Sequence, residues 1–443
     1  MKKRSWMLCM GLVLALLLSA CGKSGEKNST ANPDSGKKEE QTKGEQGDEE
    51  DEEQDGQTSS GDPVKINIWL AGSGDATYDE AYRAIFDAYC AEHTNVSYEL
   101  TFISWGDYFT KLNTGLVGGA GPDLYMLGYG QMGSVQALGY TLALNDYIPE
   151  EYHENYYENI LNAATIDGKI YGLLEPATRP YFYRKDIAAA NQVTEEEINI
   201  KTPEDFYNLV RKLTVYDENG KVVTYGLEID PDGEQDFFAL LGMYDEDARL
   251  WNDDITAAFD SPEAIQAVEG IRALVDEGCV CFRDPSATSD GLTNGVASMV
   301  LFAETGYVNM DAAFPGNVGV VKNDMTTLLI GNFLAVNSES KNKETAADML
   351  IHMFSEDSGR IKQEKIGQFA SMYSLEDAYL EANPNFENVI HSYQHSRTYS
   401  DTMTAQYTEL ITGFRTGFET ILRGADAASE LESMAETWNG LLQ

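Results

Sequence analysis

The chain has 443 residues, enough for two domains of ~150–200 residues each. Its 73 Asp and Glu against 31 Lys and Arg give a formal net charge of −42. This charge argues against nucleic acid as a partner, because phosphate binding requires clustered Lys and Arg. It also disfavours a strongly anionic ligand, unless local arginines overrule the average field. The five histidines form no metal-like cluster in the sequence, so we expect neither a bound metal nor a cofactor.

The N-terminal segment has the pattern of a secretory signal. A basic stretch at residues 2–4 precedes an apolar run over residues 6–18, which is too short to span a bilayer. The run ends in "LSAC", which resembles the bacterial lipobox, where the signal is cleaved before a lipidated cysteine. We therefore expect residues 1–20 to be a lipoprotein signal peptide and Cys21 to carry the lipid. An ordinary signal cleaved near Ala20 is the alternative.

A disordered acidic tether is predicted after this cysteine. Residues 22–62 contain no Val, Ile, Leu, Met, Phe, Tyr or Trp, and they carry 13 acidic and 5 basic side chains. Such a segment cannot bury enough apolar surface to offset its ordering entropy. Treated as a flexible chain, it spans about 35 Å from end to end. Residues 21–62 would thus hold a folded body at a distance from a membrane.

Three cysteines remain in the folded part of the chain. They are Cys90, Cys279 and Cys281, and an odd number cannot pair fully within one chain. Cys279 and Cys281 are expected to face the same side of a strand as small buried side chains.

Strands and helices alternate from residue 63 onwards. Strands are predicted at 64–72, 96–104 and 122–127, and helices with apolar residues at helical spacing at 78–95 and 105–119. This alternation predicts an α/β domain with a largely parallel sheet. Ligands of such sheets bind beyond the carboxyl ends of the strands.

The same alternation returns after a bend at Glu175-Pro176. Thr202 as N-cap, with Pro203 and Asp205 behind it, predicts one helix start, and Ser261 before Pro262 predicts another. Strands are predicted at 222–230, 296–302 and 327–338, the last interrupted by Gly331, and helices at 202–214, 233–243, 261–278 and 343–355, with two more near the C-terminus. Two α/β units joined by a bend suggest two lobes.

Five stretches carry motifs in a recognisable order. They are "WGDYFTKLNTGLVGGAGPDLYML", "GKIYGLLEPATRPYFYRKDI", "TPEDFYNLVRKL", "GVASMVLFAETGY" and "GNFLAVNSESKNKETAADMLIHMFSED". Together they resemble the family 1 extracellular solute-binding proteins of bacterial ABC importers, the sugar-binding group that includes maltose-binding protein. The resemblance covers nearly all of residues 64–440. Phe206 takes the place of the family's aromatic at the third motif.

The resemblance implies two α/β lobes, each a sheet flanked by helices, which exchange chain at hinges. We expect one lobe at 64–175 plus 303–336 and the other at 176–302 plus 337–443. A carbohydrate, expected to be an oligosaccharide, would bind in the cleft between them, and the lobes would close over it. The family further implies a monomer that is not an enzyme and that delivers its ligand to ABC permease subunits.

The lipid anchor would place this protein on the extracellular face of the membrane of a Gram-positive-type cell. A binding lipoprotein for a non-sugar solute, such as a polyamine or a peptide, is the alternative function. An enzyme is not expected, because the chain contains no G-x-S-x-G, H-E-x-x-H or P-loop pattern.

A sugar site needs flat aromatic rings for the C–H faces and polar side chains for the hydroxyls. By strand-end position and by the resemblance, nine residues are expected to contact the sugar: Asp75, Trp105, Tyr129, Gln131, Arg179, Asp236, Tyr307, Asn332 and Phe333. Tyr307 falls where the family usually has a stacking Trp, and Asn332 with Phe333 replaces its Gly-Trp. Arg179 could donate two hydrogen bonds to hydroxyls or to a carboxylate. Each has a structural alternative, such as an inter-lobe salt bridge for Arg179.

Overall fold

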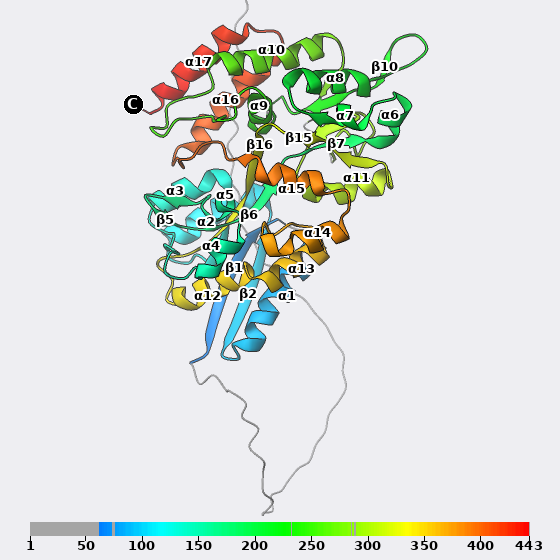
Figure 1. Ribbon diagram of the computed structural model, residues 1–443. Helices are drawn as coiled ribbons and strands as arrows, with labels where there is room; N and C mark the ends of the chain where they lie inside the picture. Colours follow the sequence, from blue (N-terminus) through cyan, green and yellow to red (C-terminus); the bar gives the residue numbers. More distant parts are fainter. Residues whose placement is uncertain (1–61, 73–75, 232, 285, 288, 443) are drawn as a thin grey trace, which may run out of the picture. The chain divides into compact units, whose positions relative to one another are not determined.

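The computed structural model describes residues 62–442 except 73–75, 232, 285 and 288. The expected signal peptide, Cys21, the tether up to residue 61 and Asp75 therefore lie outside the described residues. Within the described part, no helix combines the length and the apolar character needed to cross a bilayer. The chain forms two larger sheets, and helices flank both of them (Figure 1).

The first sheet has the strand order β17-β16-β3-β1-β2, with β6 paired to β16. Strands β1 and β2 are parallel along their whole length, and β3 continues the parallel part, whereas β16 is antiparallel to both β3 and β6. The strands are β1 (Val64–Ala71), β2 (Val96–Ile103), β3 (Leu124–Gly128), β6 (Leu173–Thr178), β16 (Thr327–Val336) and β17 (Ser396–Arg397). Helices α1 (Ala76–Glu92) and α2 (Trp105–Val117) complete the predicted alternation, which is confirmed.

Strand β16 runs unbroken through Gly331, where an interruption was expected. The absent side chain allows β6 to approach, because a Cβ atom at Gly331 would lie 2.1 Å from the backbone oxygen of Glu175. The glycine therefore permits close strand packing and does not end the strand.

The second sheet has the order β12-β11-β13-β7-β14. Strand β11 is parallel to β12 and β13, and β7 is antiparallel to β13 and β14. The strands are β7 (Tyr181–Arg184), β11 (Leu227–Ile229), β12 (Val280–Phe282), β13 (Met299–Leu301) and β14 (Val318–Val320). The adjoining helices are α6 (Lys185–Ala190), α8 (Pro203–Leu213), α9 (Glu234–Leu241), α10 (Pro262–Asp276) and α11 (Tyr307–Ala313).

Both predicted helix caps are confirmed. The hydroxyl of Thr202 accepts a hydrogen bond from the backbone N–H of Asp205 at 3.2 Å, and the Asp205 carboxylate accepts from the N–H of Thr202 at 3.0 Å. Ser261 accepts from the N–H of Ala264 at 3.1 Å. Each cap satisfies N–H groups that have no partner inside the helix.

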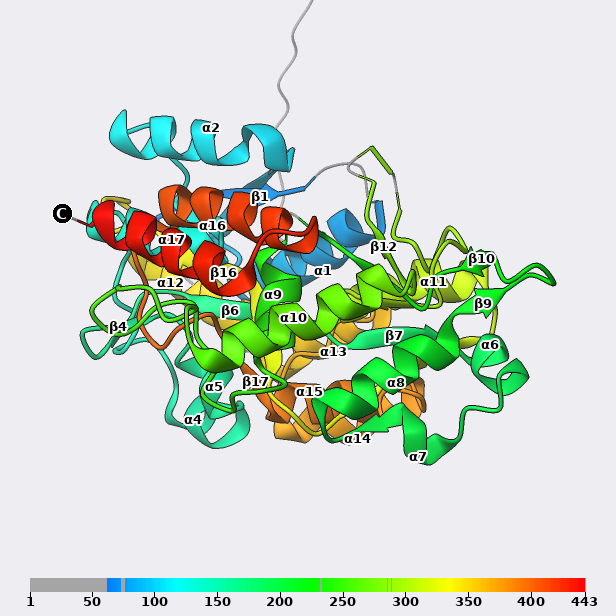
Figure 2. The same cartoon turned by 90° about the horizontal axis from the view of Figure 1, so that it is seen from above.

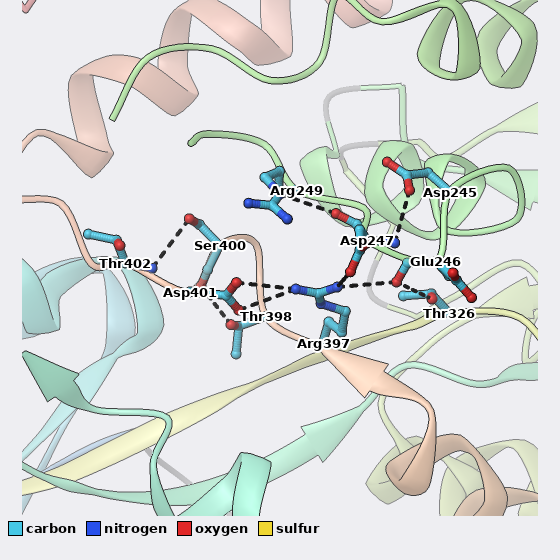
Figure 3. Close-up of polar contacts among 10 residues, drawn as sticks. All are labelled: Asp245, Glu246, Asp247, Arg249, Thr326, Arg397, Thr398, Ser400, Asp401 and Thr402. Atoms are coloured by element: carbon cyan, nitrogen blue, oxygen red, sulfur yellow. Dashed lines mark hydrogen bonds and ion pairs between the residues drawn. The ribbon is translucent and has the colours of Figure 1, made fainter. Parts of the chain in front are cut away.

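The chain passes between the two sheets at three places. The first passage joins β6 to β7, the second joins β14 to β16, and the third leads from β17 to α16 (Tyr407–Leu422). Arg397 fixes the third passage: it contacts Asp247, donates to the backbone oxygen of Glu246 at 3.3 Å, and donates to Asp401 at 3.2 Å (Figure 3). Thr326 in the second passage donates to the same Glu246 oxygen at 3.0 Å. One loop after α9 therefore holds two of the three passages.

The C-terminal third of the chain is shared between the two sheets. Helices α12 (Lys343–Met353) and α13 (Glu356–Ile366) pack on α1 beside the first sheet, whereas α16 and α17 (Ala427–Gly440) pack on each other and on α10 (Figure 2). The expectation placed all of 337–443 in the second lobe, and the structure divides this segment instead. Within 303–336, expected in the first lobe, β14 joins the second sheet and β16 the first.

Shorter elements connect these parts. The helices are α3 (Met132–Ala137), α4 (Glu150–Asn155), α5 (Glu158–Leu161), α7 (Glu195–Ile198), α14 (Glu376–Ala382) and α15 (Glu387–Gln394), and the short strands are β4 (Thr165–Ile166), β5 (Lys169–Ile170), β8 (Asn199–Ile200), β9 (Val215–Tyr216), β10 (Val222–Thr224) and β15 (Lys322–Asn323). Three 3-10 turns are η1 (Tyr129–Gln131), η2 (Glu304–Gly306) and η3 (Tyr373–Leu375). Cys90, Cys279 and Cys281 are unpaired; Cys279 is buried, whereas Cys281, on β12, is only partly so.

Candidate functional site

A cavity of about 510 Å³ lies at the carboxyl ends of three neighbouring strands of the second sheet. Asp230 directly follows β11, Arg283 follows β12 and Phe302 follows β13. Strand β7 runs antiparallel to β13, so Arg179, two residues before β7 begins, reaches the same edge. This edge is where ligands bind in sheets of this kind, and the volume is in the range of small-molecule sites.

The cavity is lined mainly by polar and charged side chains. The lining residues are Arg179, Asp230, Pro231, Gly233, Glu234, Gln235, Asp236, Phe282, Arg283, Leu301, Phe302, Ala303, Arg415, Glu419 and Arg423. They come from the crossing before β7, the start of α9, the ends of β12 and β13, and one side of α16. Planar polar groups and two phenylalanine rings thus share one enclosed space.

Glu234 organises the side of the cavity formed by α9 and α16. Its carboxylate is buried and accepts hydrogen bonds from Nε of Arg415 at 2.7 Å, from the hydroxyl of Tyr407 at 3.2 Å and from that of Tyr399 at 3.3 Å. As Glu234 is the first residue of α9, its negative charge also interacts favourably with the helix dipole. These contacts fix Arg415 in the wall of the cavity.

Replacing Glu234 by glutamine is expected to lower the free energy of unfolding by roughly 1.5–3 kcal/mol, because Arg415, the buried Tyr399 and the partly buried Tyr407 lose a carboxylate acceptor. Urea denaturation measures this loss. The matched control is Glu419→Gln, which lines the same cavity but pairs with Arg423 in an exposed ion pair, and its loss is expected to stay below about 1 kcal/mol. Equal losses in the two variants would contradict the role given to Glu234.

Two of the arginines lie against the phenylalanine rings. The guanidinium carbon of Arg283 lies 5.6 Å from the ring centre of Phe302, and that of Arg423 lies 5.3 Å from the ring centre of Phe282. Arg283 is further held by Glu228, with its Nε 3.0 Å from a carboxylate oxygen. Each ring therefore makes a cation–π contact with one arginine and also offers apolar surface.

Arg179 differs from the other three arginines of the cavity. Its Nε donates to the side-chain oxygen of Gln235 at 2.8 Å, and its Nη1 is buried without a hydrogen-bond partner among the described residues. Loss of solvation lowers the pKa of this guanidinium. Arg179 therefore has unused hydrogen-bonding capacity at the cavity.

Burial also changes the pKa of two carboxyl groups, Asp236 and Glu304, that act electrostatically on Arg179. Desolvation raises the pKa of Asp236 well above its ordinary value, which favours the neutral carboxylic acid. Desolvation likewise raises the pKa of Glu304 to about 7, although the hydrogen bond from the hydroxyl of Tyr393, 2.7 Å from its carboxylate, acts in the opposite direction. Burial therefore reduces the negative charge that both acids offer to Arg179.

Of the nine residues expected to contact a sugar, the structure brings Arg179 and Asp236 together at the cavity. Asp75 lies outside the described residues. Trp105 is 46% exposed at the start of α2 and packs against Phe109, with ring centres 5.9 Å apart. Tyr307, the first residue of α11, packs its ring edge-on against Phe386 and is not among the residues that line the cavity.

The other four expected residues lie in or beside the first sheet. Phe333 is fully buried in the core, and Tyr129 packs on it with ring centres 6.0 Å apart. Asn332 pairs with Gly128 and Glu175 within the sheet, and Gln131 ends the turn η1. None of these four is among the residues that line the described cavity. Tyr129 does contact the ring of Tyr407, which in turn donates to Glu234.

Sequence reasoning missed most of the cavity. Arg283 and Phe302 could have been found, because they directly follow predicted or plausible strands in "VCFRD" and "VLFAETG". Arg415, Glu419 and Arg423 could not, since nothing in the sequence places the C-terminal helix α16 over those strand ends. Among the described residues, no group of three or more His, Cys, Asp or Glu side chains is arranged to hold a metal ion.

Comparison with known proteins extends these observations. Residues 73–360, well over half of the chain, match the family described as bacterial extracellular solute-binding protein. The erythritol/L-threitol-binding protein of Mycolicibacterium smegmatis is 26% identical over 407 residues, which cover 81% of this chain and 83% of that protein.

Solved structures share the fold at low identity. The cyclic alpha-maltosyl-1,6-maltose binding protein from Arthrobacter globiformis matches with a TM-score of 0.74 and 19% identity, over 86% of this chain and 99% of that one. An ABC substrate-binding protein from Listeria monocytogenes in complex with cycloalternan matches with a TM-score of 0.71 and 20% identity, over 86% and 99% of the two chains. The chain therefore belongs to the bacterial extracellular solute-binding proteins and has the two-lobed α/β fold of the maltose-binding-protein-like members that serve ABC transporters.

Proposed function

We propose that this protein captures a carbohydrate in the cavity between β11, β12, β13 and α16, and that it delivers the sugar to an ABC permease. The observation that carries the proposal is the lining of the cavity, in which planar polar side chains lie beside the rings of Phe282 and Phe302. Hydroxyls need both donors and acceptors, and the paired arginines and carboxylates supply both. The relatives named for polyols and oligosaccharides support the same class of ligand.

The unpaired Arg179 weighs against the polyamine alternative. Four acidic side chains and four arginines line the cavity, but Arg179 has no carboxylate within 4.0 Å among the described residues, and a polycation beside it would be repelled. A peptide has no comparable observation in its favour. We therefore propose an oligosaccharide or a smaller sugar as the ligand.

The remaining steps of the proposal rest on the N-terminal sequence and on the family. Cleavage before Cys21 and lipidation of its thiol would hold a monomeric receptor at the extracellular face of the membrane of a Gram-positive-type cell. The three passages between the sheets are suited to hinge closure over a bound sugar. Closure would then present the loaded form to the permease.

A thermal-shift screen tests the ligand class. A sugar that binds the native state at 100 times its Kd adds about 2.7 kcal/mol to stability, and the melting temperature rises accordingly. Phe302→Ala is expected to weaken binding by ~1–3 kcal/mol, because a ring that packs against the sugar is lost. Tyr373→Ala, which removes an exposed aromatic ring that does not line the cavity, is the control.

Two results would overturn this assignment. Stabilisation by a polyamine or a peptide, with no effect of any sugar, would reject the carbohydrate. A large loss of sugar affinity in Tyr307→Ala, with none in Phe302→Ala, would move the site from the cavity to the surface of α11.

A further inference from the structure

We propose that the sugar bound by this protein carries a single carboxylate, as a uronic acid does, and that Arg179 binds this carboxylate. The inference rests on the proposed carbohydrate function and names the substrate class of the same cavity. The net charge of −42 disfavours an anionic ligand for the chain as a whole. An anion can therefore bind only where positive side chains are concentrated locally.

Arginine is concentrated at the cavity. The chain contains 12 arginines, and four of them line this one space. Arginine presents a planar fork of N–H donors that matches the two oxygens of a carboxylate, and it is therefore the residue that most often recognises this group. A strongly acidic protein that gathers a third of its arginines around one cavity has a locally different field there.

Three of the four arginines already have carboxylate partners within the protein. Nε of Arg415 lies 2.7 Å from Glu234 and Nε of Arg283 lies 3.0 Å from Glu228, whereas Arg423 pairs with Glu419 at 2.8 Å. These pairs are close to neutral. They offer donors and acceptors to sugar hydroxyls but no net charge to an anion.

Arg179 has no such partner among the described residues. No carboxylate lies within 4.0 Å of its guanidinium there, Nε is used by the uncharged Gln235, and Nη1 is buried with no hydrogen-bond partner in that part of the chain. A buried, unpaired charge is unfavourable in the free protein, and an incoming anion would remove this cost.

The nearby acidic side chains do not act as the carboxylate partner of Arg179. Asp236 lines the cavity at the start of α9, where burial favours its neutral form. Glu304 is buried beside the cavity residue Ala303, and its carboxylate is bonded to Tyr393. Asp230 also lines the cavity, but it lies near Arg283, with its carboxylate oxygen 3.9 Å from Nη1. One arginine of the cavity, Arg179, is therefore left without a carboxylate partner among the described residues, which matches a monoanion better than a phosphate dianion. A carboxylate on a sugar ring fits this count, and the remaining ring hydroxyls fit the paired residues.

Isothermal titration with matched ligands tests the inference. The probes are aldobiouronic acids, disaccharides with one carboxylate, each compared with the same disaccharide after reduction of the carboxylate to an alcohol. For the pair that fits the cavity, we expect the native protein to bind the acid roughly 10- to 100-fold more tightly than the reduced form. The preference should shrink as salt is raised.

Variants assign the preference to one side chain. Arg179→Gln should remove the preference, because the affinity for the acid falls while the affinity for the reduced form changes little. Arg179→Lys should keep part of the preference, because the positive charge remains although the planar fork of N–H donors is lost. The control is Arg184→Gln, which removes the same charge from a partly buried arginine that pairs with Asp186 outside the cavity, and it should keep the full preference. Circular dichroism of each variant checks that it is folded.

The outcomes separate this inference from the function on which it rests. If the reduced form binds as tightly as the acid, or if a neutral sugar binds while no acid does, the carboxylate is wrong and the carbohydrate function stands. If Arg179→Gln keeps the preference, Arg179 is not its source and the inference fails. If no sugar of either kind binds, both proposals fail.

Discussion

Replacing Lys362 by methionine is expected to lower the free energy of unfolding by about 3–5 kcal/mol, the largest loss that we predict for a single side chain. Lys362 lies on α13, and its Nζ is 2.6 Å from the carboxylate of Glu175 on β6. The two side chains are 5% and 2% exposed. The hydroxyl of Tyr82 donates to the other oxygen of the same carboxylate. Removal of the lysine leaves a buried carboxylate with one neutral donor.

Equilibrium urea denaturation of the variant measures this loss as a shift of the midpoint. Lys65→Met is the matched control, because Lys65 also lies 2.6 Å from a carboxylate, that of Glu99, but both side chains are more than half exposed. Water solvates that carboxylate when the lysine is removed, so a loss of less than about 1 kcal/mol is expected. The comparison holds the distance constant and changes only the burial.

A double variant distinguishes the effect of the lost ion pair on stability from the effect of the changed side-chain shape. In Lys362→Met combined with Glu175→Gln, no buried charge is left, and Tyr82 keeps an acceptor. The double variant should therefore be more stable than Lys362→Met alone, although it carries one more substitution. If Lys362→Met costs no more than the exposed control, this buried pair does not hold α13 on β6.

The second large effect is a dependence of stability on pH that comes from Glu304. Burial raises the pKa of this carboxyl from the ordinary 4.5 to about 7. Between these two values the folded state keeps the proton and the unfolded state loses it, so stability falls as the pH rises through this window. At 1.36 kcal/mol for each pH unit, the loss amounts to about 3 kcal/mol.

Glu304→Gln removes this contribution, because glutamine does not titrate. We expect the native protein to lose about 2–3 kcal/mol more than the variant between pH 4.5 and pH 8, measured by urea denaturation at several pH values. Asp236 also has a raised pKa, so the difference between the two proteins isolates Glu304 where the total profile does not. Glu419→Gln, which removes a partly exposed carboxylate of α16, is the control for the substitution itself. Parallel profiles for the native protein and Glu304→Gln would show that Glu304 titrates at its ordinary pKa.

The pH effect and the site are linked through Arg179. The charge of Arg179 acts to lower the pKa of Glu304, so the two groups interact although no hydrogen bond joins them. As the pH falls below 7 a growing share of Glu304 is protonated and neutral, so Arg179 faces less negative charge. An anion at the cavity should therefore bind more tightly at pH 6 than at pH 8, and Glu304→Gln should reduce this difference.

Local features of the fold could be predicted from the sequence. The parallel strands β1, β2 and β3, the capping box at Thr202 and the two C-terminal helices all follow from short patterns. These features depend on contacts within a few residues, such as a side-chain oxygen that caps a nearby N–H, or an apolar stripe at helical spacing. The family followed from the order of several such motifs, and the comparisons confirm it.

The site was predicted only in part, for a physical reason. Arg179 and Asp236, which line the cavity, could be proposed from the sequence because they stand at a chain crossing and at a helix start, which are visible as bends and caps. Arg415 and Arg423 reach the cavity only because α16 packs against α9 and α10, more than 130 residues earlier in the chain. Phe333 was expected at the site from the family resemblance, and its position on β16 buries it completely.

The sequence by itself determined the α/β class, the family and the acidic character of this protein, because each depends on composition or on short-range pattern. Only the tertiary structure decided how the C-terminal helices divide between the two sheets, which arginines share one cavity and which of them has no carboxylate beside it. These features depend on the packing of segments that lie far apart in the sequence. That packing places Arg415 beside the carboxylate of Glu234 and leaves Arg179 without a carboxylate partner among the described residues. The chain as a whole is negatively charged, whereas the gathering of four of its arginines at one cavity results from the fold.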